Sequence, residues 1–314
     1  MRLILMGTGP FAVPAFEQLY ATPHGVVALV TAPVREHRGR AVEPPSPLRR
    51  LAGEHGTPVF DPQDVNAPES QRQLRSHAAD LLVVCDYGQI LKSATLATAR
   101  LGGINLHASL LPKYRGAAPI NWAIYHGETA TGVTAIRMTP QLDAGPCIAR
   151  VETTIGPEET AVELEARLAR LAAELLRRSL EMLAAGRAEL LPQDPALTSR
   201  APRLKKTDGA IDWNRPAAAI KNQIRALEPW PKTYTFWHRG EAVPLRLILG
   251  PVGVVEGEGV PGTVLEAAGG RLVIAAGQAA VAPLAVQPAG KRPMATEEFL
   301  RGHHVQPGDR LGPA

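Results

Sequence analysis

Short apolar runs alternate with helical patterns along the first third of the chain. The runs lie at Arg2–Met6, Val26–Thr31, Asp80–Cys85 and Gly103–His107, and each has the length of a buried strand. A helix is predicted between the first two runs, over Pro10–Tyr20. Strands that alternate with helices are typical of a parallel sheet with crossover connections, so the pattern predicts an α/β domain.

The pattern changes in the second half of the chain. Thr131–Met138 and Cys147–Ile155 are predicted to be antiparallel strands, because only a short loop joins them, and a long helical pattern follows. Prolines without hydrophobic periodicity then mark 191–204 as a linker. We therefore predict one domain over 1–190 and a second over 205–314.

The second domain is predicted to be a small β-barrel, because its apolar runs are short and lie between Gly and Pro turns. One helix is predicted before them, at Ala217–Ala226. The strand candidates are Leu245–Leu249, Gly262–Glu266, Leu272–Ala275 and Ala279–Val286.

Candidate chemistry gathers where the run Gly103–His107 ends. Side chains alternate along a strand, so Asn105 and His107 point to the same face. Asn105 can donate to a developing oxyanion, His107 can accept a proton from an attacking amine, and Asp143 can orient the imidazole from another loop. No nucleophile elbow is present, which favours direct acyl transfer. The alternative is that these are ordinary loop and turn residues.

Two glycine-containing turns follow predicted strands. The first, Gly7–Ala12, fits the dinucleotide fingerprint, but no acidic residue follows the second strand and Pro10 removes one backbone donor. We interpret it as a tight turn near an anionic substrate. The second, Asp86–Leu91, is either a backbone edge that binds a flat heterocycle or an ordinary connecting loop.

Composition narrows the class of protein. The chain has 314 residues, of which 45% are hydrophobic and 20% charged, as in a globular protein with two domains. The net charge of +4 permits a polyanionic partner, and the Arg-rich stretch Pro33–Arg50 suits a phosphate backbone or is simply solvated. Two cysteines are too few for a disulfide framework or a zinc site, and no apolar stretch has the length of a membrane span.

Several motifs together resemble the folate-dependent formyltransferases. In the first domain these are Asn105-Leu106-His107, the loop from Ser109 to Ile120, and Asp143. In the second domain the motifs resemble the C-terminal domain of the methionyl-tRNA formyltransferases, and they are Arg203–Lys206, Ile211–Trp213, Pro229–Pro231 and Gln287–Met294.

The resemblance implies a Rossmann-like formyltransferase domain followed by an OB-type barrel. It implies transfer of a formyl group from 10-formyltetrahydrofolate to the α-amine of methionyl initiator tRNA. This reaction requires no metal, no obligate protein partner is predicted, and the presence of only two cysteines fits a reducing cytoplasm. Asn105, His107 and Asp143 are then catalytic. The implied folate contacts are Ser109, Leu110, Leu111, Pro112, Tyr87, Gly88, Gln89, Ile90 and Leu91, and the tRNA contacts are Arg38, Arg40, Lys205 and Lys206.

Three positions depart from the family pattern. Gly9-Pro10 replaces the usual Pro-x pair of the first turn, Asp86 replaces a small apolar residue, and Gln141 replaces a glycine. The alternative within the family is a formyltransferase that acts on a sugar nucleotide or another small amine. Outside it, a NAD-dependent dehydrogenase lacks its ribose-binding acid, and a non-catalytic RNA-binding module leaves the catalytic set without a role.

Overall fold

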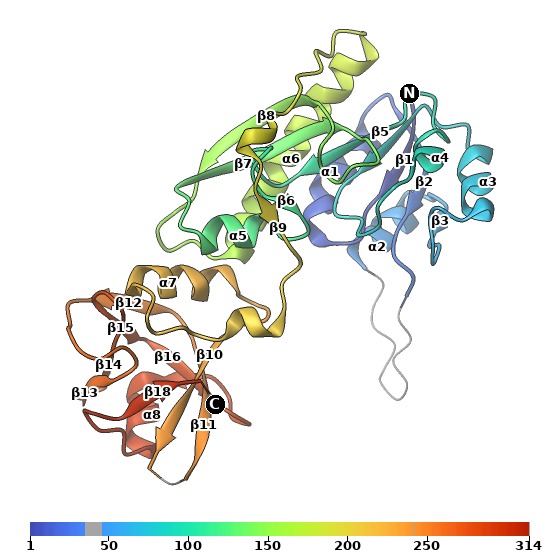
Figure 1. Ribbon diagram of the computed structural model, residues 1–314. Coiled ribbons are helices and arrows are strands. Elements are labelled where there is room, and N and C mark those ends of the chain that lie inside the picture. Colours follow the sequence, from blue (N-terminus) through green and yellow to red (C-terminus); the bar gives the residue numbers. More distant parts are fainter. Residues whose placement is uncertain (35–45, 241, 314) are drawn as a thin grey trace. The chain divides into compact units, whose positions relative to one another are not determined.

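The computed structural model describes residues 1–34, 46–240 and 242–313 (Figure 1). The chain forms two compact units, each with its own core. The first comprises Met1–Pro119, Ala130–Thr154 and Leu164–Pro202, and the second comprises Ile120–Thr129, Ile155–Glu163 and Arg203–Ala314. Most of the segment 191–204 therefore belongs to the first unit.

A seven-stranded sheet, in the order β3-β2-β1-β4-β5-β7-β8, forms the centre of the first unit. The five strands from β3 to β5 are parallel, whereas β7 runs antiparallel to both β5 and β8. The predicted mostly parallel sheet is thus confirmed. The strands are β1 (Arg2–Met6), β2 (Gly25–Val30), β3 (Val59–Phe60), β4 (Leu81–Val84), β5 (Gly103–His107), β7 (Ala130–Arg137) and β8 (Cys147–Thr154).

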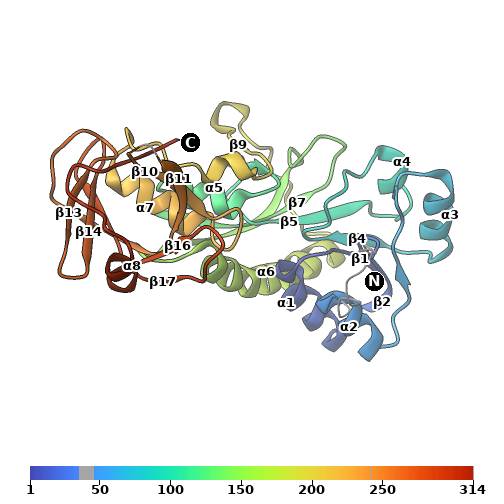
Figure 2. The ribbon, with the colours of Figure 1, turned by 90° about the horizontal axis from the view of Figure 1, so that it is seen from below.

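Helices cover both faces of this sheet. The helices α3 (Pro68–Ser76) and α4 (Ser93–Leu96) pack on β1, β2 and β4 through Leu74 and Leu96. Figure 2 shows the other helices on the opposite face, namely α1 (Val13–Glu17), α2 (Pro47–Glu54) and α6 (Ala161–Ala184).

The predicted helix over Pro10–Tyr20 is three short pieces instead of one. These are η1 (Pro10–Ala12), α1 and η2 (Gln18–Ala21). Each proline lacks the N–H that an α-helix interior needs, and both η1 and α1 carry a proline in their first two positions. The prolines therefore favour short helical pieces over a continuous helix.

The second unit is an all-antiparallel β domain with the helices α7 (Ala217–Ala226) and α8 (Thr296–Gly302). One sheet has the order β17-β16-β11-β10-β18 and the other β12-β15-β14-β13. A bridge between Thr263, next to the edge strand β13, and Arg310, in the edge strand β18, joins one edge of each sheet. Such a contact between sheet edges is what closure into a barrel requires. The strands are β10 (Thr233–Arg239), β11 (Ala242–Leu249), β12 (Val252–Val255), β13 (Val264–Ala268), β14 (Arg271–Ala275), β15 (Ala280–Pro283), β16 (Ala285–Pro288), β17 (Met294–Ala295) and β18 (Arg310–Gly312).

The predicted strand Ala279–Val286 was wrong in one respect, because it is two strands, β15 and β16, in different sheets. The exposed Leu284 separates them, and its N–H donates to Pro251 O while Ala285 O accepts from Gly250 N. These bonds hold the corner at which the chain passes from one sheet to the other.

Three short elements remain: β6 (Arg115–Gly116), β9 (Arg200–Ala201) and α5 (Pro119–Tyr125). The strands β6 and β9 pair in parallel within the first unit. None of the helices in the described residues combines the length and the apolar character that crossing a membrane requires.

Candidate functional site

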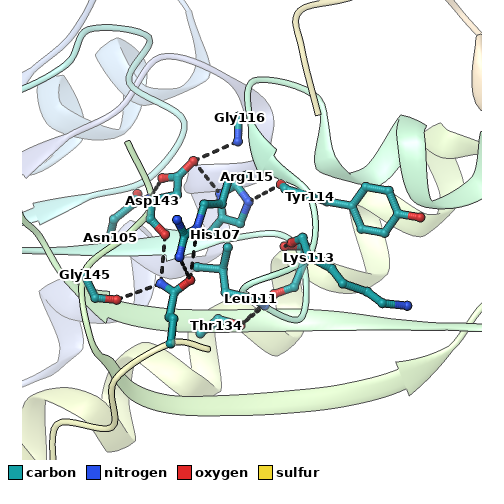
Figure 3. A network of polar contacts seen from close by, with 12 residues as sticks. Asn105, His107, Leu111, Lys113, Tyr114, Arg115, Gly116, Thr134, Asp143 and Gly145 are labelled. Carbon is teal, nitrogen blue, oxygen red and sulfur yellow. Dashed lines mark hydrogen bonds and ion pairs between the residues drawn. The ribbon is translucent and has the colours of Figure 1, made fainter. Parts of the chain in front are cut away.

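Asn105, His107 and Asp143 lie together at the carboxyl end of β5 (Figure 3). Asn105 Nδ2 donates to Asp143 Oδ1 over 3.3 Å, and His107 Nδ1 lies 3.6 Å from Asp143 Oδ2. The second carboxylate oxygen also accepts from Gly116 N over 2.9 Å. An amide, an imidazole and a carboxylate therefore converge, although the first two come from β5 and the third from the loop between β7 and β8.

The two ring nitrogens of His107 have different surroundings. Its Nε2 is 2.8 Å from the carbonyl oxygen of Tyr114, so Nε2–H donates to that backbone group and fixes the tautomer. Nδ1 is then the nitrogen left to exchange a proton, and its 3.6 Å separation from Asp143 is longer than a hydrogen bond. Catalytic contacts of this kind often shorten when substrate binds.

The backbone at this site is strained at two side-chain-bearing residues. Tyr114 has a φ of +62° and Asp143 a φ of +49°, both in the left-handed region. Such conformations cost about 1–3 kcal/mol each and persist where the surroundings enforce them. Here the Tyr114 carbonyl accepts from His107 and the Asp143 carboxylate accepts from Asn105, so both strained loops are tied to β5.

The segment Ser109–Pro112 forms an ordered turn after β5. Ser109 Oγ donates to Lys113 O over 2.7 Å, and Thr134 Oγ1 on β7 both donates to Ser109 O and accepts from Leu111 N. Ser109 and Leu111 are buried, while Leu110 and Pro112 are partly exposed. That these four residues contact folate stays a prediction, with Leu110 and Pro112 offering the accessible surface.

The loop Tyr87–Leu91 is held by hydrogen bonds with residues of the loop between β3 and α3. Gln89 accepts from Val65 N over 3.0 Å, and Asn66 Nδ2 donates to Ile90 O over 2.9 Å. Leu91 is buried, whereas Gly88, with a φ of +84°, and Ile90 are exposed. The loop thus presents backbone and one apolar side chain to solvent, as a wall for a flat heterocycle would.

Tyr87 itself faces the core of the first unit. It is buried, and its hydroxyl has no hydrogen-bond partner among the described residues. Burial, with a smaller contribution from the charge of Asp64, raises the pKa of Tyr87. Its phenol therefore stays neutral, and its part in the predicted folate contact is limited to the backbone and the shape of the loop.

Two departures from the family pattern meet in space. The N–H of Gly9 donates to the carboxylate of Asp86, and a Cβ at position 9 would lie 1.8 Å from Asp86 Oδ2. Asp86 is exposed as a residue, but the carboxylate turns toward the first turn, where loss of water raises its pKa to about 6. Burial, and then the charge of Asp86, also raises the pKa of Glu165.

Gln193 also contacts this site and was not predicted from the sequence. Its side chain donates to the carbonyl oxygens of Asp143 and Gly145 and accepts from Arg115. Nothing in the local sequence marks this glutamine, since it lies in the proline-containing segment that was predicted to be a linker. A glutamine side chain can donate and accept hydrogen bonds at once, but this property alone does not indicate where its partners lie.

Only two of the four predicted tRNA-binding residues are among the described residues. Arg38 and Arg40 fall in 35–45, outside the described residues, whereas Lys205 and Lys206 are exposed on the second unit. Within the described ranges, no three His, Cys, Asp or Glu side chains gather as metal ligands would.

Comparison with known proteins places this site in a family. Residues 1–180 match the formyl transferase family and residues 203–304 match its C-terminal domain. A methionyl-tRNA formyltransferase of Geobacter sulfurreducens is 42% identical over 316 residues, which cover 100% of this chain and 98% of that protein. The chain belongs to the methionyl-tRNA formyltransferase family. A family member from Moorella thermoacetica is 43% identical over 320 residues, 99% of each chain.

Solved structures share the fold at lower identity. An N-formyltransferase from Helicobacter canadensis, in complex with folinic acid and dTDP-3-aminofucose, has a TM-score of 0.66 at 18% identity over 90% of this chain and 98% of its own. HypX from Aquifex aeolicus, in complex with tetrahydrofolic acid, has a TM-score of 0.60 at 15% identity over 95% of this chain and 46% of its own. The predicted family, fold class and methionyl-tRNA formyltransferase activity are confirmed.

Proposed function

We propose that this enzyme transfers the formyl group of 10-formyltetrahydrofolate to the α-amino group of methionyl initiator tRNA. The convergence of Asn105, His107 and Asp143 carries the proposal, because these three side chains provide a hydrogen-bond donor, a proton acceptor and an orienting carboxylate. The full-length likeness to methionyl-tRNA formyltransferases supports methionyl-tRNA as the acceptor. A cytoplasmic location is part of the same proposal.

The reaction requires one bond to form, one to break and one proton to move. The methionyl nitrogen attacks the formyl carbon, and the new C–N bond gives a tetrahedral intermediate with a negative oxygen. Asn105 Nδ2 and His107 Nδ1–H donate to that oxygen, in a site where such donors typically contribute 10²- to 10³-fold to the rate. The bond from the formyl carbon to folate N10 then breaks, and N10 takes the proton that the amine loses.

Asp143 has two parts in this scheme. One carboxylate oxygen faces both His107 Nδ1 and Gly116 N, and the other faces Asn105 Nδ2, so a single side chain aligns both oxyanion donors. Its negative charge also favours the cationic imidazole that forms when the amine loses its proton. Proton return to N10 then proceeds from His107 and Asp143 through a bound water.

The donor and acceptor occupy different surfaces in this proposal. Folate lies against the loop Tyr87–Leu91 and the accessible residues of Ser109–Pro112. The tRNA contacts Lys205 and Lys206 with its phosphates, since both ammonium groups are exposed. Arg38 and Arg40 are further proposed tRNA contacts.

One assay tests the function directly. Purified enzyme with 10-formyltetrahydrofolate is given methionyl initiator tRNA or methionyl elongator tRNA, and formylmethionine is measured after hydrolysis of the ester bond. We expect rapid formylation of the initiator and little of the elongator. No transfer to either tRNA, with transfer to an amino sugar nucleotide instead, would establish the alternative acceptor class.

A further inference from the structure

One glutamine side chain connects both catalytic loops. Gln193 Nε2 donates to Asp143 O over 2.8 Å and to Gly145 O over 2.7 Å, in the loop between β7 and β8. Gln193 Oε1 accepts from Arg115 Nη2 over 2.6 Å and from Nε over 3.1 Å, in the loop after β5. The amide is therefore used at both ends, and its two ends hold loops that provide Asp143 and the backbone near His107.

The surrounding segment reinforces this arrangement. Ser199 Oγ accepts from Tyr114 N and Ser199 O accepts from Arg115 N, each over 2.9 Å. Beyond Ser199, β9 pairs with β6. A further backbone pair joins Leu191 and Cys147, close to the Asp143 loop. Among these contacts, only the side chain of Gln193 reaches both loops.

We propose that Gln193 is a positioning residue for formyl transfer, which fixes the Asp143 loop through its amide N–H groups. The inference rests on the proposed function. Asp143 has a φ of +49°, so its loop needs external hydrogen bonds to keep that backbone conformation. The carboxylate bonds to Asn105 and Gly116 are on one side of the residue, and Gln193 holds the carbonyl on the other.

Two variants separate the ends of the side chain. Gln193→Glu keeps an oxygen for Arg115 but places a carboxylate oxygen against the carbonyls of Asp143 and Gly145. Gln193→Met removes both ends at similar length and without charge. Because a misplacement of about 1 Å in catalytic groups can cost on the order of 10²-fold, we expect both variants to lower kcat by about 10- to 100-fold.

The Michaelis constants distinguish positioning from general damage. The loop Tyr87–Leu91, which we propose as a folate contact, is held by Val65 and Asn66 and not by Gln193. The KM for 10-formyltetrahydrofolate should therefore stay within about threefold of wild type in both variants. A Gln193→Glu variant with wild-type kcat would overturn the proposal, because it would show that contact with Arg115 alone suffices.

A matched control lies in the second unit. Gln223 Nε2 also donates to two backbone carbonyls, those of Asp208 and Ala210, and its Oε1 accepts from Arg215 over 3.3 Å. Gln223 is buried, whereas Gln193 is partly exposed, so Gln223→Met should lower the Tm at least as much as Gln193→Met. With saturating substrates it should leave kcat unchanged. Equal losses of kcat in the two variants would indicate a purely structural role and overturn the proposal.

Amide hydrogen exchange tests the same inference without turnover. In Gln193→Met, peptides that cover residues 141–145 should exchange faster than in wild type, and in Gln223→Met they should not. If wild type fails to formylate methionyl-tRNA, the proposed function fails, while faster exchange at 141–145 still supports the positioning contact. Unchanged exchange in Gln193→Met would reject that contact whatever the substrate is.

Discussion

Replacing His107 in two ways should separate its structural role from its chemical role. At a strand end we would expect a polar side chain to add little to the core, but that expectation is wrong here, since His107 is 5% exposed. The ring is covered by the loop that returns through Tyr114, whose carbonyl it binds. Substitution by alanine therefore removes packing and a hydrogen bond together with the proton acceptor.

The cost of His107→Ala can be worked out from these contacts. Removing the ring leaves the Tyr114 carbonyl without its donor, at about 1–3 kcal/mol, and opens a cavity. Together the two effects should lower the free energy of unfolding by about 2–5 kcal/mol. A loss of this size is a large part of the stability of an ordinary domain.

His107→Gln should preserve the fold and remove the chemistry. A glutamine amide reaches about as far as Nε2 of the ring, so it can donate to Tyr114 O and keep the free energy of unfolding within about 1.5 kcal/mol of wild type. An amide does not exchange a proton near neutral pH, and loss of a general acid–base group typically lowers kcat by about 10²- to 10⁴-fold.

The two variants need one stability assay and one activity assay. Urea unfolding followed by circular dichroism gives the free energies, and formylation of methionyl initiator tRNA gives kcat. A His107→Gln enzyme with wild-type kcat would refute the proposed proton exchange at His107. A His107→Ala enzyme as stable as wild type would refute the energetic argument from burial.

Three further changes test other parts of the site. Asp143→Asn should lower kcat by about 10²- to 10³-fold, because one amide cannot accept from both Gly116 and Asn105, and single-turnover kinetics would measure it. Replacing Lys205 and Lys206 by Ala should raise the tRNA KM and flatten its salt dependence, whereas Arg301→Ala, a cation already paired with a glutamate, should change neither. The free energy of unfolding of Asp86→Asn, relative to that of wild type, should increase as the pH rises from about 4 to about 7. The wild-type carboxyl, with a folded pKa of about 6 against an ordinary 3.8, holds a proton in the folded chain that the unfolded chain has lost, so wild-type stability falls as pH rises; a constant difference would contradict this.

The sequence was sufficient where local pattern decides structure. The strand Gly103–His107 was predicted with the bounds that the structure has, and alternation placed Asn105 and His107 on one face. Asp143 was found through its motif and the family resemblance, since spacing alone could not bring a loop 38 residues from Asn105 to the same place. The pairing of β5 with β7 is what carries that loop to the site.

The sequence was insufficient where polar groups meet over long separations. Gln193 and Arg115 are 78 residues apart, and Ser199 and Tyr114 are 85 apart. The segment between Leu191 and Pro202 has no hydrophobic periodicity, and the contacts that join it to the site are hydrogen bonds to residues of two loops. A pattern of apolar residues cannot report such contacts, and prolines near them favour the interpretation as a linker.

The departures at positions 9 and 86 are best understood as one change. A proline at position 9 has no N–H to offer, and any Cβ there would collide with the Asp86 carboxylate, 1.8 Å away. A small apolar residue at position 86 would in turn leave the Gly9 N–H without that acceptor. Thr8 donates to the carbonyls of both Asp86 and Tyr87, so the first turn still anchors the start of the loop Tyr87–Leu91. Each departure therefore makes the other acceptable, and the hydrogen bonds between the first turn and the loop Tyr87–Leu91 remain in place.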